Sequence, residues 1–156
     1  MVDVIFVCGK ICSGKNTFCQ KLVEEGYVHV VVSDIVKKIT QSTDREQLAD
    51  TKHLDQVIAR ELLVQIRENN RVVIDGIRQH SILVALVIGM PINLSCEFVW
   101  LEVPEEELKR RFLTRSAEKD KNIEFEQALQ KDDVLGLGEL ERWFKKSLRT
   151  QIINNY

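Results

Sequence analysis

The sequence contains little that would divide the chain into parts. It has two prolines among 156 residues, and it shows no internal repeat and no low-complexity segment. A linker rich in proline is therefore excluded, and the length suits one domain with a sizeable core and little room for a second module. We expect a single domain over residues 1–156.

Charge and cysteine content exclude further classes. The formal net charge of −2 lacks the basic excess that announces nucleic-acid binding, although a local basic groove stays open. The cysteines lack the spacing of a metal site, so we interpret them as core thiols of a reducing compartment. They are Cys8, Cys12, Cys19 and Cys96.

Long apolar runs are also missing. None approaches the roughly 20 residues of a membrane span, and the acidic Asp3 leading directly into an apolar segment is unlike a secretory signal. We expect a soluble cytoplasmic protein with no membrane partner, and we leave its oligomeric state open.

The most informative segment that is present runs from Gly9 to Thr17. It fits the phosphate-binding loop pattern of Gly, four residues, Gly and Lys. The two glycines allow a tight turn that points backbone N–H groups at a phosphate, and Lys15 adds a cation for the β- and γ-phosphate oxygens. Asn16 stands where Ser or Thr is expected, which makes it a poorer ligand for Mg²⁺. We predict that this loop binds a nucleoside triphosphate through Gly9, Ile11, Cys12, Ser13, Gly14, Lys15, Asn16 and Thr17.

The loop also has the context that it requires. An apolar, strand-like run over Val4–Cys8 precedes it, and apolar residues at helical spacing follow Lys15 until Gly26. The alternative is a glycine-containing turn between strand and helix with an incidental lysine. Because strand, glycines, lysine and helix occur together, we favour the phosphate-binding interpretation.

The remaining chain alternates strand-like and helix-like segments. This alternation predicts an α/β fold of three layers, a five-stranded parallel sheet with helices on both faces and ligands at the carboxyl ends of its strands. The further strands are expected over 27–32, 71–74, 96–103 and 150–153, and the further helices over 54–67, 81–88 (apolar nearly all round, hence short and buried), 104–115 and 123–132.

Carboxylates follow two of these strands. Asp75 ends an apolar strand, a pattern that holds Mg²⁺ in phosphate-loop proteins, and capping of the next turn or helix is the alternative. Asp34 follows the second strand and could take the proton of an acceptor hydroxyl as a general base. Its alternative is a helix N-cap before Ile35, and the two roles can coexist. Asn16 and Asp75 are thus the predicted metal ligands.

Arginines supply the other half of a phosphoryl-transfer site. Arg78, just past the third strand, could hold an acceptor phosphate or carboxylate. Arg111 and Arg115 lie one helical turn apart after the fourth strand, where either could offset charge on the transferring group. A solvated basic face is the alternative for this pair. The predicted catalytic set is Lys15, Asp34, Arg78, Arg111 and Arg115.

Taken in order, these segments resemble the nucleotide-kinase branch of phosphate-loop proteins. That branch includes dephospho-CoA kinases, nucleoside monophosphate kinases and phage deoxynucleotide kinases, and the resemblance covers nearly the whole chain. It rests on the loop, on Ser33-Asp34, on the Asp-Gly-x-Arg turn at 75–78, on Val103-Pro104 followed by the two arginines, and on the last strand at 152–154. Asn16 before Thr17 is most similar to phage deoxynucleotide kinases and to phage kinases acting on 5-hydroxymethyluracil in DNA.

The resemblance implies a kinase that uses ATP and Mg²⁺ and transfers the γ-phosphoryl group to a nucleotide-type acceptor. It also implies an adenine contact near Asn154 and a short lid over residues 111–123. The acceptor that we favour is a modified pyrimidine nucleotide of the 5-hydroxymethyl-dU type, in DNA or as a free deoxynucleotide, and dephospho-CoA is the alternative. From other classes, a nucleotide-binding switch or a degenerate binding domain stays open.

Overall fold

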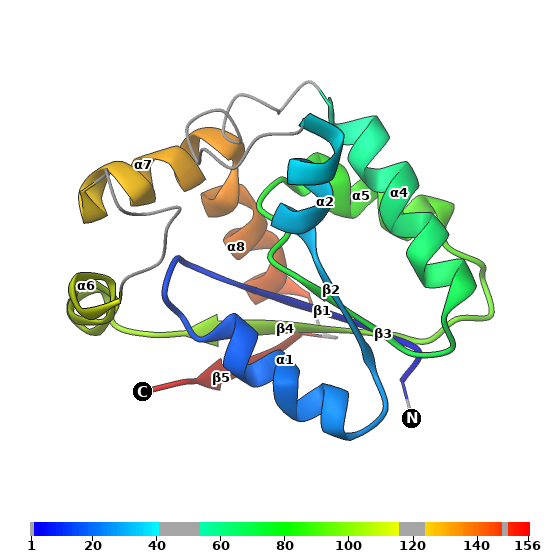
Figure 1. Cartoon of the computed structure of the whole chain (residues 1–156), viewed down its shortest axis with the longest axis horizontal. Coiled ribbons are helices and arrows are strands. Elements are labelled where there is room, and N and C mark those ends of the chain that lie inside the picture. Colours follow the sequence, from blue (N-terminus) through cyan, green and yellow to red (C-terminus); the bar gives the residue numbers. More distant parts are fainter. Residues whose placement is uncertain (1, 41–53, 116–123, 148–149) are drawn as a thin grey trace.

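One parallel sheet forms the centre of the molecule. The structure is a computed structural model that describes residues 2–40, 54–115, 124–147 and 150–156. Its five strands lie in the order β2-β3-β1-β4-β5, and every neighbouring pair is parallel (Figure 1). The strands are β1 (Val4–Gly9), β2 (Val28–Val31), β3 (Val72–Asp75), β4 (Cys96–Glu102) and β5 (Thr150–Asn154). The predicted α/β class and the five-stranded parallel sheet are confirmed.

Helices cover both faces of this sheet. Helix α1 lies on one face, and α4, α5 and α8 pack on the other (Figure 1). Helices α6 and α7 pack on each other beside the end of the sheet where β4 leaves it. The described helices are α1 (Lys15–Glu24), α2 (Val32–Thr40), α4 (Asp55–Glu68), α5 (His80–Gly89), α6 (Glu105–Thr114), α7 (Phe125–Leu135) and α8 (Leu137–Lys146).

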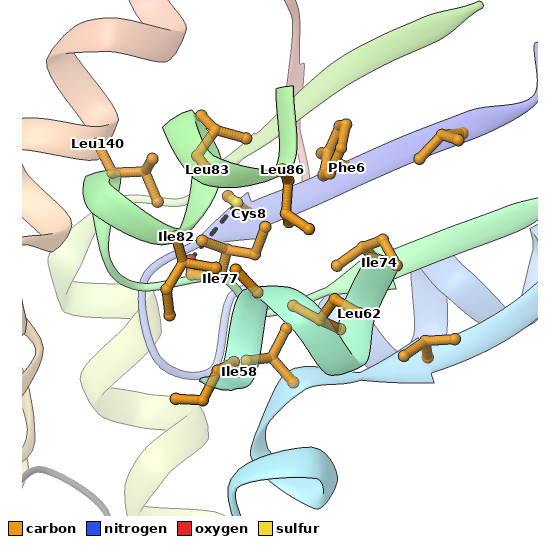
Figure 2. Close-up of a cluster of buried hydrophobic side chains, with 14 of the residues drawn as sticks. Phe6, Cys8, Ile58, Leu62, Ile74, Ile77, Ile82, Leu83, Leu86 and Leu140 are labelled. Atoms are coloured by element: carbon orange, nitrogen blue, oxygen red, sulfur yellow. Dashed lines mark hydrogen bonds between the residues drawn. The ribbon is translucent and has the colours of Figure 1, made fainter. Parts of the chain in front are cut away.

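The larger core lies under α4, α5 and α8. Alternation along β1 points Phe6 and Cys8 to this face and Val7 to the α1 face. Figure 2 shows Leu62 of α4 and Leu86 of α5 meeting this face of the sheet, and all these side chains are fully buried. Each contributes about 1.5–3 kcal/mol through removal of apolar surface from water. The Cys8 thiol donates to the carbonyl oxygen of Ile77 at 3.5 Å, the dashed line in Figure 2.

The sheet register positions the site. Asp75, the last residue of β3, is paired with Val31 at the end of β2 and with Val7 near the end of β1. Gly76 then turns the chain with a φ of +89°, a left-handed conformation that favours glycine. The carboxyl ends of three neighbouring strands therefore meet at one edge, beside the loop that follows β1.

Several predicted boundaries were wrong. Strand β2 ends at Val31 and helix α2 begins at Val32, because burial of Val32, Ile35 and Val36 on one helical stripe outweighs their β propensity. The apolar segment over 81–88 was predicted to be a buried helix, but the side chain of Ile88 in α5 is 78 % exposed. Helix α7 continues to Leu135 and α8 was not predicted.

None of the helices in the described ranges is long and apolar enough to span a membrane.

Candidate functional site

A cavity of about 670 Å³ lies where the sequence places the ligand, at the carboxyl ends of the strands. It brings together residues from the loop, from α2, from the end of β3, from α6 and from α7. Most of the predicted site residues line it, whereas Gly9, Ser13 and Asn154 do not. The lining residues are Ile11, Cys12, Gly14, Lys15, Asn16, Thr17, Val31, Ser33, Asp34, Lys37, Asp75, Gly76, Arg78, Arg111, Arg115 and Asp132.

Both loop glycines are required, for different reasons. Gly14 has a φ of +89°, and a Cβ there would lie 2.5 Å from Asn155 Nδ2. Gly9 needs no unusual φ, but a Cβ would lie 2.5 Å from the Oγ of the buried Ser13. Cys12 also adopts a left-handed φ of 64°, so two residues of the loop turn the backbone sharply. The result is the compact cradle that the spacing predicts.

Lys15 lies at the centre of this cradle. Its ammonium donates to the carbonyl oxygens of Gly9 at 3.1 Å and Lys10 at 3.0 Å. Burial lowers the pKa of Lys15, and the nearby charge of Asp75 opposes that shift. Helix α1 begins at this residue, and its first residues line the cavity, so its positive end faces that space with no acidic side chain in the first turn to offset it. Cradle, ammonium and helix terminus together suit a phosphate group.

A clamp made of Arg111 and Asn155 holds the loop from outside. The Arg111 guanidinium donates to the carbonyl oxygens of Cys12 at 3.2 Å and Asn155 at 2.7 Å. The Asn155 amide donates to the carbonyl oxygen of Ser13 at 2.7 Å. Hydrogen bonds from Arg110 and Arg111 lower the pKa of Glu107 to about 2, so this carboxylate stays charged and orients Arg111.

Asp75 is buried and held by side chains from two other elements. His29 Nε2, on β2, lies 2.8 Å from Asp75 Oδ2, and because a carboxylate only accepts, that nitrogen carries the proton. On the other side lies the buried Cys19 of α1. Burial, followed by Asp75 itself, raises the pKa of the Cys19 thiol, which therefore keeps its proton and donates to the carboxylate. Ligand-type atoms of all three residues lie within 4.8 Å of one another. Asp75 does not cap the next helix, α5, whose N-cap residue is Gln79.

Sequence reasoning assigned His29 no role. The signal was present, because the histidine interrupts an apolar strand next to the strand that ends in Asp75. Strand order, which the sequence leaves open, was needed to connect the two.

The cavity also holds two pairs of opposite charge. Asp34 lies in the first turn of α2, not at its N-cap, so that alternative was wrong. Its side chain is 70 % exposed, and Lys37 Nζ lies 3.9 Å from its Oδ1. Arg78 Nε lies 3.3 Å from Oδ1 of Asp132, whose side chain is 4 % exposed.

Asp132 was missed by sequence reasoning. It occupies the apolar stripe of α7, between the buried Ala128 and Leu135. A carboxylate at such a position is the signal that could have found it, because buried charges in proteins are paired.

The two predicted lid arginines differ in position. Arg111 belongs to α6, whereas Arg115 follows its last residue with a ψ of 147°. They do not share a helical face, yet both line the cavity. The Arg115 guanidinium carbon lies 5.9 Å from the centre of the Phe112 ring. Most of the predicted lid, residues 116–123, lies outside the described residues.

The AAA domain family matches residues 5–132, a range that contains the loop, Asp75, Arg78 and Asp132. The chain belongs to the AAA domain family.

Solved structures show that this AAA domain shares its fold with proteins described as kinases. A sugar kinase from Janibacter sp. HTCC2649 aligns with a TM-score of 0.67 and 15% identity, covering 99% of this chain and 86% of its own. Shikimate kinase from Bacteroides thetaiotaomicron aligns at 0.63 and 15% identity, covering 98% and 86%. TT1252 from Thermus thermophilus aligns at 0.61 and 19% identity, covering 99% and 89%. No curated protein matches the sequence. At these identities the likeness establishes the fold.

The residues of this AAA domain fit the ligands that the sequence predicts. A Cβ at either loop glycine would collide with a neighbouring side chain, so the cradle around Lys15 requires both glycines, and the ammonium supplies positive charge for a triphosphate. Asp75 could hold Mg²⁺ through its carboxylate, and Asn16, exposed on the same cavity, could add an amide oxygen. Asn154 is exposed outside the cavity, and its adenine contact stays a prediction.

Proposed function

We propose that this AAA domain is a phosphotransferase that uses ATP and Mg²⁺ and transfers the γ-phosphoryl group to a nucleotide-type acceptor. One observation carries the proposal. A single cavity contains the loop lysine, a buried strand-end carboxylate, an exposed carboxylate and three arginines. Positioned charges of both signs around one space are what phosphoryl transfer requires, because its catalysis consists of positioning and charge stabilisation.

Each side chain has a role that follows from its place. Lys15 and the loop N–H groups would hold the β- and γ-phosphates, and Asp75, fixed by His29, would hold Mg²⁺. Arg115 would offset charge on the transferring group. Arg111 would stabilise the loop instead, because its guanidinium donates to the carbonyl oxygens of Cys12 in the loop and of Asn155 after β5.

Asp34 is suited to receive a proton. Its carboxylate would take the proton of the acceptor hydroxyl while the hydroxyl oxygen forms a bond to the γ-phosphorus. The bond between that phosphorus and the bridging oxygen breaks, and ADP leaves with the electron pair. The high exposure of Asp34 leaves it open to an acceptor that approaches from solvent.

The finer assignment of the acceptor rests on the resemblance of the loop. Asn16 before Thr17 favours a pyrimidine deoxynucleotide with a 5-hydroxymethyl group, in DNA or free. Dephospho-CoA is the second candidate, because Ser33-Asp34 matches the acidic position of its kinases. In both, the acceptor atom is a hydroxyl oxygen.

The test is Mg²⁺-dependent transfer of labelled γ-phosphate from ATP across a panel of acceptors. The panel contains 5-hydroxymethyl-dU as a nucleotide and in DNA, unmodified DNA, dephospho-CoA and deoxynucleoside monophosphates. We expect label on a hydroxyl acceptor. Label only in free phosphate would instead indicate a switch, and tight ATP binding without turnover would indicate a degenerate binding domain.

Lys15→Ala tests whether the loop takes part. Loss of the ammonium should reduce the transfer rate by about a hundredfold or more, because its charge is realised against the phosphates in the transition state. Lys10→Ala is the matched control, since Lys10 belongs to the same loop but does not line the cavity. Circular dichroism should show both variants folded. An unchanged rate in Lys15→Ala would remove the loop from the mechanism.

A further inference from the structure

The charges on the acceptor side of the cavity are balanced in pairs. Lys37 lies 3.9 Å from Asp34, and Arg78 lies 3.3 Å from Asp132. The loop side differs, since the Lys15 ammonium contacts two carbonyl oxygens and no carboxylate forms an ion pair with it among the described residues. The cavity therefore contains a loop ammonium without a carboxylate ion pair, which suits the triphosphate, and two pairs of opposite charge, which we assign to the acceptor.

Asp132 is the unusual residue among these two pairs of charges. Its side chain is 4 % exposed, and its Oδ1 makes no hydrogen bond within the described ranges although Arg78 Nε is 3.3 Å away. A buried carboxylate is costly unless it is paired and hydrogen-bonded. The ion pair supplies the countercharge, but part of the capacity of Asp132 to accept hydrogen bonds is unused.

Stability of the fold does not explain the pair. Asp132 interrupts the apolar stripe of α7, and a hydrophobic side chain of similar size would continue that stripe. Replacement of buried ion pairs by apolar residues is often neutral or stabilising, so a carboxylate at this position is retained at a cost. Both partners line the cavity. These facts point to a ligand.

We propose that Asp132 and Arg78 form the acceptor subsite and that they select an uncharged, hydroxyl-bearing group over a phosphate. The inference rests on the proposed function and assigns the recognition of its hydroxyl acceptor to these two side chains. A hydroxyl donates one hydrogen bond and accepts others, so it matches a carboxylate next to a guanidinium. A phosphate dianion would find Arg78 already neutralised and would be repelled by Asp132.

The test compares Asp132→Asn with Asp133→Asn. Asparagine keeps the shape of Asp132 and removes its charge, and the adjacent Asp133 is exposed and does not line the cavity. ADP formation is measured against acceptor concentration for alcohols (5-hydroxymethyl-2′-deoxyuridine, dephospho-CoA) and for deoxynucleoside monophosphates. Titration of each variant with an ATP analogue measures the affinity for the triphosphate separately.

The wild-type protein should turn over an alcohol in preference to the monophosphates. Asp132→Asn should raise the KM for the alcohol about tenfold or more and leave the affinity for the ATP analogue unchanged. Because Arg78 is then unpaired, turnover of monophosphates should increase relative to the alcohol. Asp133→Asn should behave like the wild-type protein.

A wild-type preference for monophosphates, or an unchanged alcohol KM in Asp132→Asn, would overturn the inference and leave the kinase assignment standing. If the protein binds the ATP analogue but forms no ADP with any of the acceptors, the proposed function itself is overturned. If Asp132→Asn does not fold, Arg78→Gln takes its place. It should raise the alcohol KM without any gain for monophosphates, and an unchanged KM would again contradict the inference.

Discussion

His29 orients the carboxylate of Asp75, although His29 does not line the cavity. Its Nε2–H points at Oδ2 of the carboxylate, and its Nδ1 lies 3.4 Å from Nε2 of Gln20, which fixes the ring from the other side. Such a partner orients a metal-binding carboxylate and limits its rotation. Asp75 is 5 % exposed, so water cannot easily replace the lost donor.

His29→Leu should therefore weaken the response to Mg²⁺. We expect about a 10- to 100-fold rise in the Mg²⁺ concentration for half-maximal transfer, because the carboxylate loses its orienting donor. His29→Gln retains an N–H donor and should recover part of the loss. His80→Gln, at a surface histidine paired with Glu139, is the control. Equal Mg²⁺ dependence in all of these variants would show that His29 has only a packing role.

The end of β5 and helix α6 act together on the loop. Arg111 donates a hydrogen bond to the carbonyl oxygen of Cys12, and Asn155 donates one to that of Ser13. These bonds preorganise the inward N–H groups before any ligand arrives, which reduces the ordering cost of binding.

Asn155→Ala should cost about one hydrogen bond, roughly 1 kcal/mol, and weaken ATP binding about fivefold. Asn154→Ala is the informative comparison, because Asn154 is exposed and the resemblance places adenine near it. Isothermal titration with an ATP analogue measures both. A larger loss in Asn154→Ala than in Asn155→Ala would contradict the importance of the clamp and support the adenine contact.

Local patterns explain which elements could be predicted. The apolar runs of β1, β3 and β4 and the stripe of α4 carry clear periodicity, and the loop motif places Lys15 without reference to the rest of the chain. Helix α8 was missed because Gly136 and Gly138 at its start indicate a turn. Gly136 does form that turn, with a φ of +107°, and the helix begins directly after it.

Pairings across the molecule could not be predicted in the same way. The contacts His29–Asp75, 46 positions apart, and Arg78–Asp132 join residues that are distant in the sequence. They exist because strand order places β2 beside β3 and because α7 packs over the end of the sheet. One sequence without that order identifies the individual residues and leaves their partners open.

An aromatic cluster joins helix α8 to the sheet. Phe144 of α8 is fully buried and contacts the rings of Phe98 and Trp100 on β4 and its neighbour Trp143, at centroid distances of 5.7, 5.9 and 5.5 Å. Because β4 pairs with β1, which leads into the loop, packing of this cluster against β4 also stabilises the sheet that carries the loop.

Phe144→Ala should lower the free energy of unfolding by about 3–5 kcal/mol, since it removes an aromatic ring from a packed core and leaves a cavity. Leu113→Ala, at a side chain that is 71% exposed, should change it by less than about 0.5 kcal/mol. Urea unfolding followed by tryptophan fluorescence and by circular dichroism measures both variants. If the domain unfolds as one unit, both probes report the same midpoint in Phe144→Ala. A fluorescence transition that precedes loss of the sheet would instead show α8 to be a separate folding unit, independent of the strands that carry the site.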